Sequence, residues 1–250
     1  NGCTNSASLY VTQDMLDINT PIVSPTFSVS PSSTYCQNLA PSNVSISISN
    51  SSNYESIIWA PSGCFDSDTT FSAPINTTHY YVFVKNSTGC SMMADQIITV
   101  NPTPNVGVTS SNSGTVCAGQ SISLTANNAS SYTWSPSISC SSPCATGTVT
   151  PPTGTTTVYT VTGTDGNGCT ATATKSITTY SAFSVTASSS NTGTVCAGDV
   201  ITLSSSNASS YSWSPSISCT GTCSSGTVVP PAGTTTVYTV TGTDGNGCTS

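Results

Sequence analysis

Short stretches in which apolar and polar residues alternate run through the whole chain. In Ser121–Ala126, Ile122 and Leu124 alternate with serine and threonine. Tyr159–Gly163 shows the same period of two, and Thr170–Tyr180 is a longer alternating run of β-branched residues. Such alternation, with turn residues about every 8–12 positions, is typical of a β-sandwich, and no stretch has helical periodicity. The pattern therefore predicts an all-β fold.

Glycine and proline mark the ends of these stretches. Gly163–Cys169 contains the turn dipeptides Asp-Gly and Asn-Gly in succession and predicts a hairpin tip. Pro151–Thr157 interrupts strand pairing just before the tyrosine-bearing stretch, because proline has no N–H to donate. Each predicted strand is therefore short and bounded by a turn.

The chain repeats itself at a spacing of 79 residues. Between Ser110–Ala171 and Ser189–Ser250, 46 of 62 positions are identical. An earlier and more diverged copy is visible where Tyr80–Cys90 aligns with Tyr159–Cys169. Self-similarity at a fixed spacing indicates an array of tandem domains.

The repeat predicts the domain boundaries. We expect residues 1–23 to be the closing strand of an upstream repeat with a linker, followed by repeat 1 (24–104, diverged), repeat 2 (105–181) and repeat 3 (182–250). Repeat 3 is expected to lack its last strand, so that the chain is a window on a longer array whose own continuation completes it. The alternative is donor-strand assembly, in which residues 1–23 of one molecule complete repeat 3 of the next and build a filament.

Charge excludes two classes of partner. Only 4% of residues are charged, the two cations are Lys85 and Lys175, and the formal net charge is −7. Binding to a nucleic-acid backbone or to anionic lipid requires many more basic side chains. Low charge with much serine, threonine and glycine also characterises disordered chains. The 12 cysteines, the regularly spaced tyrosines and tryptophans and the alternation favour a folded chain instead.

Cysteines recur at fixed places in each repeat. Domains this small bury a modest core and need further stabilisation. Four cysteines allow three disulfide connectivities, and sequence alone does not choose among them. The sets are Cys117, Cys140, Cys144 and Cys169 in repeat 2, and Cys196, Cys219, Cys223 and Cys248 in repeat 3.

We expect these disulfides to form within repeats. Cys140 and Cys144 flank a three-residue loop, whereas Cys117 and Cys169 begin strands on either side of the sandwich. Chain entropy assigns about 4 kcal/mol to the long bridge and about 2 kcal/mol to the short one. The expected pairs are Cys36–Cys90, Cys117–Cys169, Cys140–Cys144, Cys196–Cys248 and Cys219–Cys223.

Two cysteines remain outside this scheme. Cys3 is expected to pair with a cysteine upstream of the chain. Cys64 is then free, joined to Cys3, or bonded to another molecule, and we favour the free thiol. Zinc is the competing interpretation of four thiols, but structural zinc sites usually have two close cysteine pairs and each repeat has one. We therefore predict disulfides, no metal and no cofactor, and an oxidising, extracytoplasmic location.

Three motifs together resemble a known family. They are Cys117–Leu124 (C-x-G-x4-L), Tyr132–Pro136 (YTWSP) and Thr155–Thr172 (TTTVYTVTGTDGNGCTAT). The chain resembles the immunoglobulin-like or PKD-like repeats of large Bacteroidetes cell-surface proteins, which include gliding-motility-type adhesins exported by the type IX system. The resemblance is strong over 105–250 and looser over 24–104. It implies tandem immunoglobulin-like β-sandwiches, display on the cell surface and a role as a stalk or adhesive filament.

The resemblance supplies no catalytic or ligand residue. It does imply O-glycosylation at Asp-Thr-Thr motifs, which makes Thr69 a glycosylation candidate. Trp134 is expected in the core near a disulfide, as in immunoglobulin domains, with sugar stacking as the alternative role.

Catalytic and calcium-binding chemistry have little support. The single histidine, His79, has no partnered nucleophile in the repeat frame, which makes a Ser-His-Asp triad a weak hypothesis. The carboxylate pairs Asp14 with Asp17 and Asp66 with Asp68 are few for calcium, which needs six to eight oxygen ligands, and acidic loops are the simpler interpretation.

The predicted function is structural. We expect an adhesive or load-bearing segment of an extracellular repeat protein, not an enzyme, whose partners are neighbouring repeats or copies of itself in a filament, with surface glycans as a further partner. The alternative is a carbohydrate-binding accessory region of a secreted enzyme.

Overall fold

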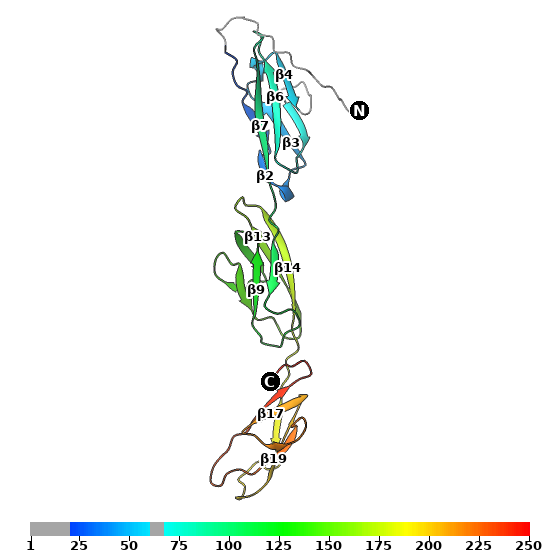
Figure 1. Ribbon diagram of the computed structural model, residues 1–250, viewed down its shortest axis with the longest axis vertical. Coiled ribbons are helices and arrows are strands. Elements are labelled where there is room, and N and C mark those ends of the chain that lie inside the picture. The colour runs from blue at the N-terminus through cyan, green and yellow to red at the C-terminus, as the bar shows by residue number, and fades with distance from the viewer. Residues whose placement is uncertain (1–20, 61–67) are drawn as a thin grey trace, which may run out of the picture. The chain divides into compact units, whose positions relative to one another are not determined.

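The computed structural model describes residues 21–60 and 68–250 as strands, turns and two short 3-10 helices (Figure 1). Two compact units divide the described chain. One contains the residues up to Asn105 together with Thr164–Ala171, and the other contains Val106–Gly163 with Thr172–Ser250. Repeat 1 lies in the first unit, and most of repeat 2 and all of repeat 3 lie in the second. Within the described ranges, no helix has the length and apolar character needed to cross a membrane.

Repeat 1 consists of two sheets with strand orders β1-β3-β5 and β2-β7-β6-β4. The elements are β1 (Phe27–Ser30), β2 (Thr34–Cys36), η1 (Gln37–Leu39), β3 (Asn43–Ile48), η2 (Ser51–Asn53), β4 (Ser56–Ala60), β5 (Asp68–Ser72), β6 (Thr78–Lys85) and β7 (Ser91–Asn101).

Alternation along the strands places the apolar side chains of repeat 1 between its two sheets. Val44 and Ile46 of β3 are buried, as are Val82 and Val84 of β6. The centre of this cluster is Trp59 of β4, which is 1% exposed and lies with its ring centroid 6.0 Å from that of Phe27. Fully burying side chains of this size contributes roughly 1.5–3 kcal/mol each, which makes this cluster the main source of stability in repeat 1.

Repeat 2 also has two sheets, with strand orders β11-β12-β9-β8 and β10-β13-β14. Ile122 and Leu124 of β9 and Tyr159 of β13 are buried between them. The strands are β8 (Gly107–Ser110), β9 (Ile122–Asn127), β10 (Ser131–Ser135), β11 (Ser139–Cys140), β12 (Thr146–Val149), β13 (Thr156–Thr164) and β14 (Thr170–Thr178).

Repeat 3 follows the plan of repeat 2, with sheets β15-β16-β19-β18 and β17-β20. Ile201, Leu203 and Trp213 form its core with Val228. The strands are β15 (Thr186–Ser189), β16 (Ile201–Ser206), β17 (Ser210–Ser214), β18 (Ser218–Cys219), β19 (Ser225–Val228) and β20 (Thr239–Thr243).

The strand order is that of an immunoglobulin-like sandwich. In repeat 1, β1 pairs antiparallel with β3 in one sheet, and the chain then switches so that β2 pairs in parallel with β7 of the other sheet. The second sheet continues through β6 to β4, which corresponds to the arrangement of strands C, F and G in immunoglobulin domains. The predicted fold class, tandem disulfide-stabilised immunoglobulin-like β-sandwiches, is confirmed.

Candidate functional site

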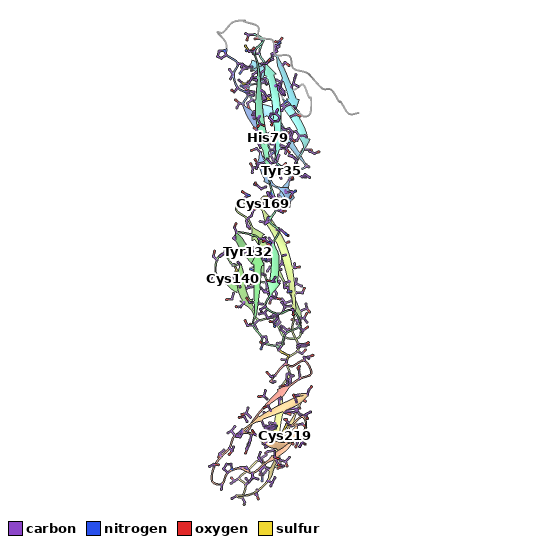
Figure 2. The ribbon with its side chains drawn as sticks, in the orientation of Figure 1. Tyr35, His79, Tyr132, Cys140, Cys169 and Cys219 are labelled. Carbon is purple, nitrogen blue, oxygen red and sulfur yellow. A yellow bond between two sulfur atoms is a disulfide. The ribbon has the colours of Figure 1, made fainter. Side chains whose placement is uncertain are left out.

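Two long disulfides join repeats that are consecutive in the sequence. Cys36 bonds Cys169 across 133 residues, and Cys117 bonds Cys248 across 131 residues. In both, the Cα atoms are 5.5 Å apart, an ordinary disulfide separation. The first cysteine of each bridge, Cys36 or Cys117, lies in the early part of its own repeat. The second, such as Cys169 in Figure 2, lies at a hairpin tip of the next repeat. Each bridge therefore ties a repeat to its successor.

The first partner is held by a parallel pairing with the last strand of its own repeat. Cys36 ends β2 opposite Asn101, the last residue of β7. In repeat 2, Val116 forms the equivalent parallel bridge to Thr179. The N–H of Val116 donates to the carbonyl of Thr178 at 3.0 Å. The cysteine is thereby fixed at the end of the closing strand.

In repeat 2 a tight turn follows this cysteine. The N–H of Gln120 donates to the carbonyl of Cys117 at 3.2 Å, and Gly119 has φ +77°. A positive φ of this size favours glycine, which explains the Cys-Ala-Gly sequence. We call the Cys-Ala-Gly segment of repeats 2 and 3 the turn. The cysteine at this position of each repeat is the turn cysteine, and in repeat 1 it is Cys36, which the 3-10 helix Gln37–Leu39 follows in place of the turn.

The second partner lies on a hairpin whose conformation is set by an acidic or amide side chain. In repeat 2, Asp165 Oδ1 accepts from the N–H of Asn167 at 2.9 Å and of Cys169 at 2.8 Å. Gly168, with φ +83°, lets the chain reverse just before the cysteine. We call this segment the tip, and its cysteine the tip cysteine.

The same tip conformation recurs in repeat 3, where Asp244 takes the place of Asp165. Desolvation raises the pKa of Asp244, but hydrogen bonds from the N–H groups of Cys248, Asn246 and Gly247 and from the Asn246 side chain outweigh it and hold the pKa below its usual value. The carboxylate form therefore stabilises this hairpin.

A further hydrogen bond accompanies the first long disulfide. The Asn38 side chain donates through Nδ2 to the carbonyl of Thr170 at 2.9 Å, one residue beyond Cys169. Cys169 itself is fully buried. The tip of repeat 2 is therefore both covalently bonded and hydrogen-bonded to residues of repeat 1, which is why Thr164–Ala171 belongs to the first compact unit.

The predicted within-repeat pairing of the long disulfides is wrong. Cys36 does not bond Cys90, Cys117 does not bond Cys169, and Cys196 does not bond Cys248. The reason is the length of the closing strand. Cys36 lies beside the end of the 11-residue β7, and Cys90 immediately precedes its start. At about 3.3 Å per residue these positions are ~35 Å apart, whereas a disulfide requires Cα atoms within ~7 Å.

The short disulfides form as predicted. Cys140 bonds Cys144, and Cys219 bonds Cys223, each with Cα atoms 5.2 Å apart. Figure 2 labels one cysteine of each pair.

Each short loop also satisfies the core tryptophan of its repeat. The indole N–H of Trp134 donates to the carbonyl of Cys144 at 3.0 Å, and Trp213 makes the same bond to Cys223 at 3.0 Å. Trp213 is buried and Trp134 is half-buried against the core. Trp134 therefore packs against the core beside a disulfide, as expected.

The remaining cysteines are not bonded or not described. Among the described cysteines, Cys90 and Cys196 are free, which contradicts their predicted place in disulfides. Cys90 is half-buried and Cys196 is exposed. Cys3 and Cys64 lie outside the described residues, and their predicted states stay predictions.

The other candidate residues do not assemble into a site. Thr69 is buried in β5, which argues against its modification in the folded repeat, and its glycosylation stays a prediction. His79 Nδ1 lies 2.9 Å from Asp95 Oδ2 on an exposed sheet face. Asp14, Asp17 and Asp66 fall outside the described residues. In the part of the chain that the structure describes, no three histidine, cysteine or acidic side chains are grouped to hold a metal.

An exposed aromatic face on repeat 1 was missed by the sequence argument. Tyr81 and Phe83 of β6 are 38% and 37% exposed, and Phe83 lies opposite the exposed Met93 of β7. His79, labelled in Figure 2, stacks on Tyr81 with ring centroids 6.0 Å apart. The alternation of β6 carries the signal, because His79, Tyr81 and Phe83 share one parity while the buried valines share the other.

Comparisons with known proteins give the fold and little more. No protein-family model matches the chain, and no curated protein matches it. Among solved structures, the fibronectin(III)-like modules of Clostridium thermocellum CbhA have 11% identity and a TM-score of 0.32 over 62% of this chain and 94% of theirs. Murine CEACAM1b has 11% identity and a TM-score of 0.35 over 62% of this chain and all (100%) of its own.

A third match is the Bacteroides ovatus protein SGBP-B of the mixed-linkage glucan utilization locus, solved with a mixed-linkage heptasaccharide. It has 18% identity and a TM-score of 0.22 over 86% of this chain and 61% of its own. Likenesses this distant carry no argument about function, and the fold assignment rests on the strand order.

Proposed function

We propose that the chain is a structural segment of an extracellular repeat protein that bears load in a surface stalk or adhesive filament. The observation that carries the proposal is the pair of disulfides that ties each repeat to the next. Such bridges persist in oxidising compartments, which supports an extracellular location. The proposal assigns no catalysis, cofactor or metal to the chain.

The long disulfides limit how far the chain can be stretched. At ~3.3–3.6 Å per extended residue, the ~210 residues from Cys36 to Cys248 reach ~700 Å when unfolded and reduced. With both bridges intact, the shortest covalent route uses only the ~50 residues between Cys117 and Cys169 and reaches ~180 Å. With both bridges intact, unfolding of the repeats therefore extends the stretch from Cys36 to Cys248 to only about a quarter of its full backbone length.

Single-molecule pulling from the two termini tests this function. We expect the fully unfolded length to increase by ~500 Å when reductant is added, as the bridged route gives way to the full backbone. A variant with Cys140→Ser and Cys144→Ser is the matched control, because its lost bridge spans only 4 residues and should leave the length nearly unchanged. An equal length with and without reductant contradicts the proposal.

The aromatic face of repeat 1 favours carbohydrate binding as a second candidate function. Tyr81 and Phe83 present ring surface beside the His79 and Asp95 side chains, which offers stacking area next to polar groups. The equivalent outward positions in repeat 2 are Thr160 and Thr162. The chain therefore contains its own aromatic-free comparison face.

Calorimetric titration with neutral oligosaccharides, including a mixed-linkage glucan heptasaccharide, tests this second function. Tyr81→Thr with Phe83→Thr should abolish binding, whereas Val158→Thr on repeat 2 should leave it unchanged. Binding that survives the double substitution, or no binding to any oligosaccharide of the panel, argues against the second function.

A further inference from the structure

Cys196 lies in the turn of repeat 3, which has the same conformation as the turn of Cys117 in repeat 2. The N–H of Asp199 donates to the carbonyl of Cys196 at 3.1 Å, as Gln120 does to Cys117, and Gly198 has φ +92°. Asp199 Oδ2 also accepts from the N–H of Cys196 at 2.9 Å. The turn is therefore built around an exposed thiol where repeat 2 has a disulfide.

Cys90 lies on the tip of repeat 1, in the same conformation as Cys169 and Cys248 on the tips of repeats 2 and 3. Asn86 Oδ1 accepts from the N–H of Cys90 at 2.9 Å and of Thr88 at 3.2 Å. The N–H of Asn86 donates to the carbonyl of Cys90 at 3.0 Å, and Gly89 has φ +93°. Repeat 1 thus has the tip conformation that carries a disulfide in repeats 2 and 3.

Both long disulfides obey one offset: the turn cysteine of a repeat bonds the tip cysteine of the repeat after it. We propose that Cys196 and Cys90 each form one half of a further disulfide of this turn-to-tip kind. Cys196 bonds the tip cysteine of another repeat of this kind, and Cys90 bonds the turn cysteine of another. This inference rests on the geometry of the turn and tip and not on the proposed load-bearing or adhesive function.

The partner thiol has two possible sources with the same chemistry. It belongs to a further repeat of the same polypeptide or to a second copy of the chain, since Cys90 of one copy complements Cys196 of another. Among the residues that the structure describes, Cys196 is the free turn thiol and Cys90 the free tip thiol, so copies linked in this way would join head to tail.

Bond formation requires an oxidant, which a small-molecule disulfide supplies. The Cys196 thiolate attacks the small disulfide, forms a mixed disulfide and releases one small thiolate. The Cys90 thiolate then attacks the Cys196 sulfur and releases the second. One small disulfide is reduced to two thiols as the two protein thiols are oxidised to one disulfide.

Mixing two variants tests the pairing. Both carry Cys3→Ser and Cys64→Ser, and one adds Cys90→Ser while the other adds Cys196→Ser. In a glutathione redox buffer we expect the Cys90–Cys196 heterodimer to predominate, as identified by non-reducing mass spectrometry and peptide mapping. Random pairing of surface thiols instead gives roughly half heterodimer with both homodimers. That random ratio, or no heterodimer, overturns the proposal.

Two substitutions at the tip separate recognition from simple thiol exposure. Asn86→Ala removes the acceptor that closes the tip and should lower the heterodimer yield several-fold. Asn86→Asp restores the side chain found in repeats 2 and 3 and should retain the yield. Equal yields in all three forms contradict a role for the tip.

Protein isolated from its natural source identifies where the partner thiol comes from. Cys196 found in a disulfide, with unchanged mass on reduction, supports a repeat of the same polypeptide. A mass that falls on reduction supports a second copy. A free Cys196 thiol in that material overturns the proposal.

Discussion

Repeats 2 and 3 have nearly the same sequence but not the same packing. In repeat 2, β13 lies between β10 and β14, and Tyr159 is 4% exposed. In repeat 3, the corresponding Tyr238 lies just before β20 and is half-buried. Among the described residues, β20 pairs with β17 and otherwise makes only the bridge from Thr243 to Thr249.

The difference shows what a strand sequence decides and what its neighbour decides. Alternation fixes which side chains face the core, and it does so equally in both repeats. The number of strands in the facing sheet differs, with β14 present beside β13 in repeat 2 and only two strands in the β17-β20 sheet of repeat 3. Core residues are buried more deeply where the third strand is present, as Ile122 at 0% and Ile201 at 8% exposure illustrate. The two tryptophans differ in the opposite sense, since Trp213 is buried and Trp134 half-buried.

The largest expected effect comes from removing the long disulfide that ends in repeat 3. Cys117→Ser with Cys248→Ser should destabilise repeat 3 by about 5 kcal/mol, because a loop of this length restricts the unfolded chain strongly. Each repeat has one tryptophan. Fluorescence of Trp213, with Trp59→Phe and Trp134→Phe, therefore reports on repeat 3 in a denaturant titration. An unchanged midpoint would show that this bridge does not stabilise the fold.

The second prediction compares the equivalent tyrosines of repeats 2 and 3, Tyr159 and Tyr238. Tyr159→Ala should cost about 3–5 kcal/mol because it empties a closed core, whereas Tyr238→Ala should cost about 1–2 kcal/mol because its site is already partly open. Burial also raises the pKa of the Tyr159 hydroxyl. Denaturant titrations followed by the tryptophan of each repeat provide the measurement. Equal costs would mean that the neighbouring strand does not set the packing.

The short disulfides should behave alike in the two repeats. Cys140→Ser with Cys144→Ser, and Cys219→Ser with Cys223→Ser, should each cost about 2 kcal/mol, because the closed loops are equally short. Both loops also accept the indole hydrogen bond of their tryptophan. A clear difference between the two double variants, measured by the same fluorescence, would locate part of the asymmetry in these loops.

The smallest expected effect is a pH dependence at the tip of repeat 3. Because hydrogen bonds lower the pKa of Asp244 in the folded chain, its contribution is present above the ordinary pKa of about 3.9 and is lost as the pH falls through the lowered value. The amide proton shifts of Asn246 and Cys248 should therefore change below about pH 4.

The control for this titration is present in the chain. Asp244→Asn should remove the pH dependence, since Asn86 already closes the tip of repeat 1 with an amide that does not titrate. A titration that persists in this variant would show that another group is responsible.

Much of the fold was predictable because it depends on local sequence. The parity of Ile122 and Leu124 predicted their burial, and the glycine dipeptides of Gly163–Cys169 predicted a hairpin tip. The bridge from Cys140 to Cys144 was predictable for the same reason, since its partners are held together by a short loop.

The long disulfides were not predictable from the repeat pattern. Cys117 and Cys196 occupy identical sequence contexts, so shifting every pairing by one repeat leaves the pattern unchanged. Only the parallel pairing of β2 with β7 reveals that the turn and tip cysteines of one repeat lie at opposite ends of the closing strand. Tyr81 and Phe83 lie on the outward parity of β6, but alternation alone does not distinguish exposed aromatic side chains from ones that a neighbouring element covers.

The two long disulfides overlap along the chain, and this has a consequence for damage. The stretch from Cys36 to Cys169 and the stretch from Cys117 to Cys248 share the residues between Cys117 and Cys169. A protease that cuts the backbone once, anywhere between Cys36 and Cys248, therefore cuts inside at least one covalent ring. The two fragments stay attached through sulfur, and a single nick within this range releases nothing from the protein.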